Sequence, residues 1–291
     1  MLCIRMLLAC VSVAALPASA ASKQSSHPMG YEIENTRVVA IHSAVLNRDY
    51  ELYLKLPKSY ATQPKRIYPV LFVHDARYAF PLVSSLTRQL GNAERIEEVL
   101  IVGISYSKGD DPDLSRTRDY TPTNSPNERI GHSVAARRAS GEAPAYLRFM
   151  RNEIFPLIAA RFRGDMSRKT YAGHSFGGLF GAYVAISAPD TFENYILSDP
   201  SLWYDNEVIF RLAQEHHTAK GVSPNILLVS ANPVEALNTP SGMVVNAKRF
   251  EALLKAQFDT NRVHWQIFDG EIHETVFPIA MSRGLLRFHA K

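Results

Sequence analysis

The pattern Gly-x-Ser-x-Gly surrounds Ser175 in the segment Thr170-Tyr-Ala-Gly-His-Ser-Phe-Gly-Gly-Leu-Phe-Gly181. A short apolar run ends in it at Lys169 to Gly173, and an apolar run of helical character follows at Leu179 to Ile186. Between a strand and a helix, this pattern places the serine on a tight turn, because glycines let the two elements approach closely. A nucleotide-binding turn is the alternative, but no phosphate-binding lysine and no Gly-x-Gly-x-x-Gly accompany it. We therefore predict that Ser175 is a nucleophile and that the backbone N–H of Phe176 donates to a developing oxyanion.

Apolar runs and helix-forming segments alternate on both sides of this motif. Arg37 to Ala44 and Tyr50 to Leu56 flank a short turn and predict an antiparallel hairpin. Tyr68 to His74 and Val99 to Ile104 are apolar on both faces, as buried parallel strands are. Further strands are predicted at 169–173, 195–197, 226–229 and 263–268, and helices at 145–162, 179–186, 205–215, 244–258 and 275–288. This alternation predicts an α/β fold with a mostly parallel central sheet, an N-terminal antiparallel hairpin and helices on both faces.

A nucleophilic serine needs a base, and where this motif occurs the acid and the histidine follow the serine along the chain. His273 lies in the loop between the last predicted strand and the last predicted helix, so it is the predicted base. For the acid we prefer Glu235, which follows the predicted strand at 226–229. Asp199, Asp205 and a Ser–His dyad without an acid remain open alternatives.

The second oxyanion donor is expected in the loop after the strand that ends at His74. Asp75-Ala76-Arg77 fills that loop, and the backbone N–H of Ala76 is the predicted donor. Segment 107–141 is polar and rich in Gly, Pro, Asp and Arg, which predicts a long loop. Long loops in compact domains are usually functional, so we expect it to border the site.

The first twenty residues have the three parts of a secretory signal peptide: Arg5, the apolar run Met6 to Leu16, and the cleavage site Ala18-Ser19-Ala20. We expect cleavage after Ala20, a flexible leader at 21–30 and a single domain at 31–291. A lipid anchor on Cys10 is the alternative, although the apolar run continues past that residue. After cleavage, the apolar content predicts no stable membrane insertion.

Composition narrows the chemistry further. Both cysteines, Cys3 and Cys10, lie in the predicted signal peptide, so a mature chain would carry no disulfide, no thiol nucleophile and no cysteine metal ligand. The formal net charge is +4 and the basic residues are scattered, which gives no nucleic-acid footprint. We expect no metal and no cofactor. The sequence does not define the oligomeric state.

The motifs together resemble the esterase family of α/β-hydrolases that includes enterochelin esterases, S-formylglutathione hydrolases and mycolyltransferases. The matching segments are Tyr68–Asp75, Arg118–Pro122, Gly173–Gly178, Ser198–Tyr204, Met243–Ala247 and Gly270–His273. They occur in order and span about residues 30–290, nearly all of the mature chain, and they are most similar to siderophore trilactone hydrolases of the salmochelin-esterase type. The family often carries Leu-Asp-Gly where this chain has His74-Asp75-Ala76. Some members of that subgroup work as Ser–His dyads.

This resemblance implies the α/β-hydrolase fold and hydrolysis of carboxylic esters through an acyl-enzyme, with a catecholate trilactone as the suggested small-molecule substrate. Arg116 and Arg118 could meet its oxygen atoms, and Trp203 and Tyr204 could stack on its rings; internal ion pairs and core packing are the alternative roles. A broad short-chain, feruloyl or acetyl esterase and an acyltransferase would use the same machinery. A non-catalytic binding module is disfavoured, because Ser175 and His273 both stand in the expected context.

Overall fold

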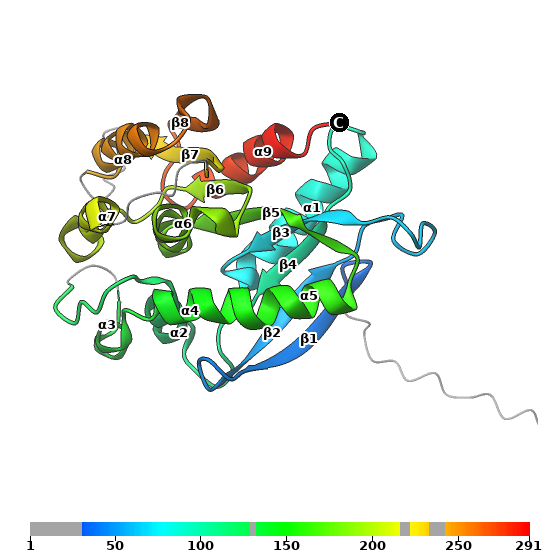
Figure 1. Ribbon diagram of the computed structural model, residues 1–291, viewed down its shortest axis with the longest axis horizontal. Coiled ribbons are helices and arrows are strands. Elements are labelled where there is room, and N and C mark those ends of the chain that lie inside the picture. Colours follow the sequence, from blue (N-terminus) through cyan, green and yellow to red (C-terminus); the bar gives the residue numbers. More distant parts are fainter. Residues whose placement is uncertain (1–30, 129–131, 216–221, 233–241) are drawn as a thin grey trace, which may run out of the picture. The chain divides into compact units, whose positions relative to one another are not determined.

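An eight-stranded sheet forms the centre of the molecule (Figure 1). The computed structural model describes residues 31–128, 132–215, 222–232 and 242–291. The strands are β1 (Thr36–Ser43), β2 (Arg48–Lys55), β3 (Tyr68–Val73), β4 (Leu100–Ile104), β5 (Gly164–His174), β6 (Asn194–Ser198), β7 (Asn225–Asn232) and β8 (Val263–Asp269). They lie in the order β1-β2-β4-β3-β5-β6-β7-β8. From residue 33 onward the described chain belongs to one compact unit.

The strand pairing confirms the predicted mixed sheet. The pairs β1–β2 and β2–β4 are antiparallel, and every later neighbouring pair is parallel. All six residues of β3 are buried. Val70 and Phe72 join one core cluster, whereas Leu71 and Val73 join the other, because successive side chains of a strand point to opposite faces. Both faces of the sheet are therefore apolar and need helices to cover them.

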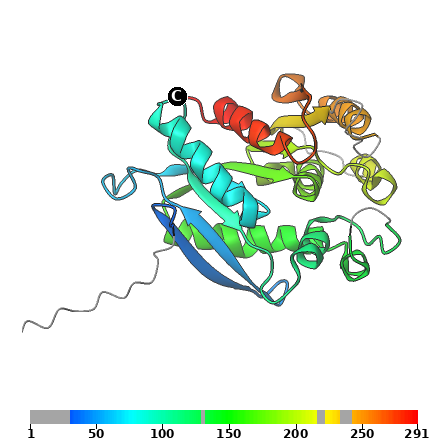
Figure 2. The same cartoon turned by 180° about the vertical axis from the view of Figure 1, so that it is seen from behind.

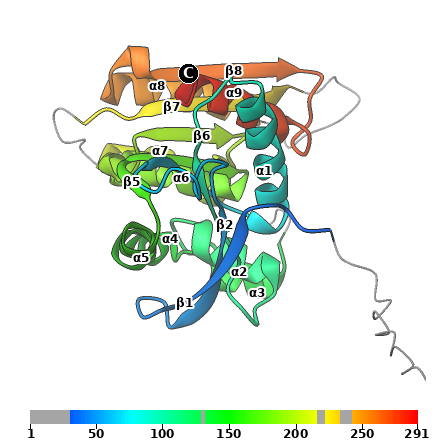
Figure 3. The ribbon, with the colours of Figure 1, turned by 90° about the vertical axis from the view of Figure 1, so that its right-hand side faces the viewer.

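Helices cover both faces, as the sequence predicted. They are α1 (Ala76–Asn92), α2 (Pro112–Tyr120), α3 (Val134–Ala139), α4 (Ala143–Phe149), a π-helical turn (Met150–Ile154), α5 (Phe155–Arg161), α6 (Phe176–Ser187), α7 (Tyr204–Glu215), α8 (Met243–Gln257) and α9 (Val276–Phe288), with 3₁₀ turns at Pro189–Thr191 and Thr260–Arg262. Helices α1 and α9 lie side by side on one face (Figure 2). Helices α4 to α8 pack on the other, and Figure 3 shows α5 and α6 on the side of the sheet opposite α1. None of the described helices is long and apolar enough to cross a membrane.

Two segments differ from the sequence-based expectation. Segment 107–141 is not a loop throughout, because it contains α2 and α3. Helix α2 begins where the Asp111 carboxylate accepts hydrogen bonds from the backbone N–H groups of Asp113 (2.9 Å) and Leu114 (3.4 Å), with Pro112 in the first turn. Helix α1 was not predicted, since Pro81 interrupts its sequence pattern, yet its buried residues recur at helical spacing.

The direction of the parallel strands determines where the site forms. Asp75 follows the end of β3, Ser175 follows β5, Asp199 follows β6, and His273 lies in the loop after β8. The carboxyl ends of parallel strands meet at one edge of a sheet, which is where ligands bind in α/β folds. Four residues that are far apart in sequence are thereby brought to the same edge.

Candidate active site

Ser175 lies on the turn between β5 and α6, where the backbone conformation is strained. Its φ and ψ are 56° and −115°, a combination that L-residues rarely adopt and that costs of order 1–3 kcal/mol. The N–H of Ser175 donates to the carbonyl of Ser198 (3.0 Å), and the N–H of Ser201 donates to the carbonyl of Ser175 (3.1 Å). The end of β6 therefore holds the strained turn in place at the start of α6.

Glycines make this turn possible. A Cβ added at Gly173 would lie 2.5 Å from the backbone carbonyl carbon of Gly177, and one at Gly178 would lie 2.9 Å from the Cα of Pro200. Both distances are shorter than real carbon contacts. The strand, the turn and the helix that the sequence predicted around Ser175 are all present in the structure.

His273 pairs with Asp199. Its Nδ1 lies 2.6 Å from Oδ2 of Asp199, a carboxylate whose residue is 2% exposed. From the sequence we prefer Glu235 as the acid, with Asp199 as an alternative; Glu235 lies outside the described residues. Asp205, the third candidate, has a different partner: its Oδ2 accepts a hydrogen bond from the Thr123 hydroxyl at 2.6 Å.

The end of β6 and the neighbouring β7 orient the Asp199 carboxylate. Asp199 has a positive φ of 40°, and its N–H donates to the carbonyl of Val229 (2.7 Å). Its Oδ1 accepts the N–H of Ala231 at 3.4 Å, which leaves Oδ2 for His273. A buried carboxylate with a fixed direction can hold an imidazole in one tautomer and stabilise its protonated form.

A second histidine, His174, stacks against His273. The two rings are 4.4 Å apart between centroids and tilted by 37°, and Nδ1 of His174 lies 3.1 Å from the Ser198 hydroxyl. Burial, His273 and Arg116 hold the pKa of His174 well below its usual range. His174 is therefore neutral at physiological pH, so it supports the ring of His273 without adding a positive charge next to it.

Sequence reasoning missed Ser201, which contacts the nucleophile. Its hydroxyl oxygen lies 3.2 Å from Oγ of Ser175, and the residue is only 1% exposed. No motif marked Ser201, because the contact arises where the loop after β6 crosses the turn after β5. Only the position of Ser201 in the matching segment Ser198–Tyr204 could have suggested a role at the site.

The two predicted oxyanion donors are the first residues of two helices. Ala76 begins α1 and Phe176 begins α6. The first N–H groups of a helix have no acceptor within the helix, so both are free to serve another partner. The helix starts lie close together, since a Cβ added at Gly177 would be 3.2 Å from Oδ2 of Asp75.

Aromatic residues surround the side chain of Phe176. His132 stacks on it at 4.5 Å between centroids, and Trp203 lies 5.9 Å away. Trp203 is only partly buried, as a wall of a site can be. Tyr204, also predicted to contact substrate, is 1% exposed and donates its hydroxyl to the carbonyl of Thr123 at 2.8 Å. This burial assigns Tyr204 to the core and corrects the prediction.

The structure also corrects the prediction that Arg118 contacts substrate. The residue is 6% exposed. Its guanidinium donates to Asp119 (2.8 Å), Asp110 (2.7 Å) and the hydroxyl of Ser107 (2.9 Å). All three nitrogens thus have internal partners, which is the alternative role expected of this residue from its sequence context.

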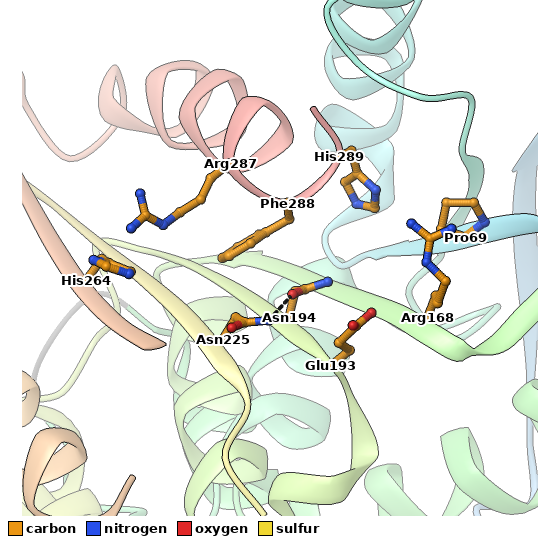
Figure 4. A pocket seen from close by; sticks show the side chains of 9 residues that line it. All are labelled: Pro69, Arg168, Glu193, Asn194, Asn225, His264, Arg287, Phe288 and His289. Atoms are coloured by element: carbon orange, nitrogen blue, oxygen red, sulfur yellow. Dashed lines mark hydrogen bonds between the residues drawn. The ribbon is translucent and has the colours of Figure 1, made fainter. Parts of the chain in front are cut away.

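A cavity of about 490 Å³ lies away from Ser175, at the other end of the strands (Figure 4). Its wall combines Asn194 at the start of β6, Asn225 at the start of β7, and the end of α9. The Asn225 amide donates to the side-chain carbonyl of Asn194 at 2.8 Å. Two arginines and one glutamate also line the cavity. None of the residues that follow the carboxyl ends of the strands lines it. We therefore do not assign the reaction to this cavity.

The sheet and the residues at its carboxyl edge have the arrangement of an α/β-hydrolase. Strand β5 of the mostly parallel sheet leads through a strained serine turn into α6, and a histidine–carboxylate pair lies at the same edge of the sheet. This is the arrangement of the α/β-hydrolases. Residues 43–237 match the profile of the Esterase family, described as "Putative esterase", and the chain belongs to that family. Its enzyme class is that of the carboxylic ester hydrolases.

Relatives and solved structures agree with this assignment. The chain is 29% identical over 264 residues to the ferri-bacillibactin esterase BesA of Bacillus subtilis, covering 88% of this chain and 90% of the relative. It is 28% identical over 276 residues to the apo-salmochelin esterase of Escherichia coli O6:H1, covering 91% and 85%. The siderophore hydrolase EstB of Aspergillus nidulans has a similar fold, with a TM-score of 0.75, 20% identity and coverage of 90% and 97%.

Proposed function

We propose that Ser175, His273 and Asp199 form a catalytic triad that hydrolyses carboxylic esters through an acyl-enzyme. The contact of 2.6 Å between His273 Nδ1 and Asp199 Oδ2 supports this proposal most strongly. It fixes the imidazole in the tautomer with a proton on Nδ1, so Nε2 is free to accept a proton from the nucleophile. The strained turn at Ser175 supports it further, since such strain is typical of catalytic positions.

The reaction has two steps. Ser175 Oγ attacks the ester carbonyl carbon while His273 Nε2 accepts its proton, and the N–H groups of Phe176 and Ala76 hold the oxyanion. The C–O bond of the ester then breaks, His273 returns the proton to the departing alkoxide, and the acyl group stays on Ser175. Water attacks the acyl carbon with the same proton transfers and releases the acid.

For the acid, the contact with His273 favours Asp199 over Glu235. An imidazole Nδ1–H makes one strong hydrogen bond, and Asp199 already accepts it. The chain order Ser, acid, His is the same with Asp199 as with Glu235. A dyad without an acid would need Asp199 to be dispensable, which substitution can test.

For the substrate, we propose a siderophore ester such as a catecholate trilactone. Two observations support the class: the names of the two relatives, and the partly buried Trp203 beside Phe176, whose ring could stack on a catechol. Arg118 no longer supports it, because its guanidinium is bound internally. Specificity depends on the shape of the wall around Ser175 rather than on the triad itself.

A comparison of kcat/KM on enterobactin, ethyl ferulate and p-nitrophenyl butyrate tests this proposal. A siderophore esterase should prefer the trilactone by orders of magnitude and lose much of that preference in Trp203→Ala. Equal rates on all three esters, unchanged by the substitution, would leave a broad carboxylesterase. Adding alcohol acceptors and analysing the products would identify an acyltransferase, because transfer esters would then accumulate at the expense of free acid.

We also propose that the protein is exported, with the mature chain in the periplasm or outside the cell. The support is the order of Arg5, the apolar run and Ala18-Ser19-Ala20 at the N-terminus. A siderophore ester would meet the enzyme there during export or iron uptake.

A further inference from the structure

The two proposed oxyanion donors belong to separate elements, so something must fix the distance between them. Ala76 N–H begins α1 and Phe176 N–H begins α6. Each follows a residue with a positive φ, 54° at Asp75 and 56° at Ser175. An oxyanion hole is effective only when its donors are held in position before the charge develops. A contact between these two turns would therefore affect catalysis directly.

Arg116 of α2 makes such a contact. Its Nε donates to Asp75 Oδ1 at 2.7 Å, and its Nη2 donates both to Asp75 Oδ2 and to the carbonyl of His174, each at 3.2 Å. Asp75 directly precedes Ala76, and His174 directly precedes Ser175. One planar guanidinium thus joins the positive-φ residue of the first turn to the residue before the positive-φ residue of the second. It also lies over the Phe176 ring, 5.4 Å from its centroid.

The carboxylate of Asp75 makes this contact and does not cap its own helix. A helix N-cap aspartate usually accepts hydrogen bonds from its own helix, yet Asp75 makes no side-chain capping bond. Instead it is 1% exposed and accepts from Arg116 and from the hydroxyl of Tyr106 at 2.7 Å. Bidentate, charge-assisted hydrogen bonds of this kind stabilise a contact and also hold its geometry.

The side chains of Arg116 and Tyr106, which donate to Asp75, keep their protons. Burial lowers the pKa of Arg116 and Asp75 raises it, and the net effect is an increase, so the guanidinium stays protonated. Burial and Asp75 both raise the pKa of Tyr106, which therefore remains a neutral hydroxyl donor. Both donors therefore keep their protons at neutral pH.

We propose that Arg116 is a positioning residue that sets the separation of the Ala76 and Phe176 N–H groups by joining Asp75 to the carbonyl of His174. This inference rests on the proposed function. Arg116 does not contact the substrate in this role, and its effect should appear in the transition state rather than in substrate binding.

The test compares Arg116→Met, Arg116→Lys and the matched control Arg77→Met. Arg77 is exposed and next to Ala76 in the sequence, so the control removes a nearby positive charge without breaking the contact. Lysine keeps the charge but cannot make the bidentate bonds. For each variant we would titrate active sites with a fluorophosphonate and measure kcat, KM and the Ki of an alkylboronic acid, which forms a tetrahedral adduct on the serine.

We expect Arg116→Met to lower kcat per titrated site about 100-fold, the scale of misplacing one oxyanion donor. The Ki of the boronic acid should rise by a similar factor, while KM changes less than about 3-fold, because only tetrahedral species use the hole. The kcat and Ki of Arg116→Lys should lie between those of Arg116→Met and wild type. Arg77→Met should have the kcat and Ki of wild type.

Two results would overturn the inference. A lower melting temperature with unchanged kcat and Ki per titrated site would make Arg116 purely structural, and a raised KM with unchanged kcat would make it a substrate contact. If Arg116→Met does not fold, Arg116→Lys carries the test with the same readouts. Failure of the proposed function is distinguishable, because it would appear as full activity in Ser175→Ala, whatever Arg116 does.

Discussion

Among single residues, His74 is unusual because its imidazole is buried directly after β3. It is 1% exposed, and neither ring nitrogen has a hydrogen-bond partner among the described residues. Aromatic rings surround it, including Tyr171 at 4.7 Å and Tyr120 at 5.2 Å between centroids. Burial lowers its pKa to about 3, although nearby Asp75 acts in the opposite direction. The folded protein therefore keeps this imidazole neutral where an unfolded chain would protonate it.

This predicts a loss of stability in acid. Between pH 6.5 and about 3 the unfolded state binds a proton at His74 that the folded state does not, so the free energy of unfolding falls as the pH falls. The slope from one such group is about 1.4 kcal/mol per pH unit. His74→Leu should reduce the stability difference between pH 7 and pH 5 by about 2 kcal/mol. Urea unfolding at both pH values measures it, and identical pH dependence in variant and wild type would refute the prediction.

Asp199 provides a second prediction at this scale. Asp199→Asn keeps the shape of the side chain but cannot hold His273 in the required tautomer, so kcat should fall by about 10²- to 10⁴-fold. Glu235→Gln is the matched variant of the carboxylate preferred from sequence and should retain wild-type kcat. Hydrolysis of p-nitrophenyl butyrate measures both. The opposite ranking would return the role to Glu235, and full activity in both variants would indicate a dyad.

Among the helices, α6 approaches the sheet closely. A Cβ added at Gly181 would lie 2.3 Å from the Tyr171 ring and 2.5 Å from Leu197 Cδ2. Gly91 of α1, by contrast, has no atom within 4 Å of an added Cβ. The same substitution should therefore act in opposite directions at two helical glycines.

We expect Gly181→Ala to destabilise the protein by about 1–3 kcal/mol through overpacking, despite the better helix propensity of alanine. Gly91→Ala should be neutral or stabilise by up to about 1 kcal/mol, because only the propensity changes. Chemical denaturation of both variants measures the difference. Equal effects would show that the packing of α6 on β5 is looser than the structure indicates.

The sequence predicted the elements whose patterns are local. The all-apolar run at Tyr68 to Val73 and the glycine turn around Ser175 could be recognised without a structure. Helix α1 could not, because Pro81 interrupts its pattern, and α2 could not, because its residues are mostly polar. Asp199 ranked below Glu235 for a similar reason, since strand and loop lengths do not show which carboxylate reaches His273.

At the scale of the whole molecule, the parallel strands assemble the site by ending at one edge. The roles of Arg116, Ser201 and His174 depend on this assembly, because their partners lie on other elements. Sequence patterns record neither the crossing of loops nor the internal partners that a guanidinium finds in the folded chain. This explains why Arg118 was assigned to the substrate, whereas the structure places it in an internal ion-pair network.

The exported form of the molecule is a further prediction. After secretion the chain should begin at Ala21, because Ala18-Ser19-Ala20 matches a cleavage site. Intact mass of the protein recovered from the periplasm or medium measures this. A mass that shows a diacylglyceryl group on Cys10 would instead establish a lipoprotein.

The proposed mechanism depends on Ser175 as the nucleophile. The most direct measurement is labelling of the full chain with a fluorophosphonate, with peptide mass spectrometry to locate the adduct and residual p-nitrophenyl butyrate hydrolysis measured on the same samples. We predict one adduct, on Ser175, with activity lost in proportion to labelling, and neither labelling nor measurable activity in Ser175→Ala. An adduct on another residue, or wild-type hydrolysis by Ser175→Ala, would show that Ser175 is not the nucleophile.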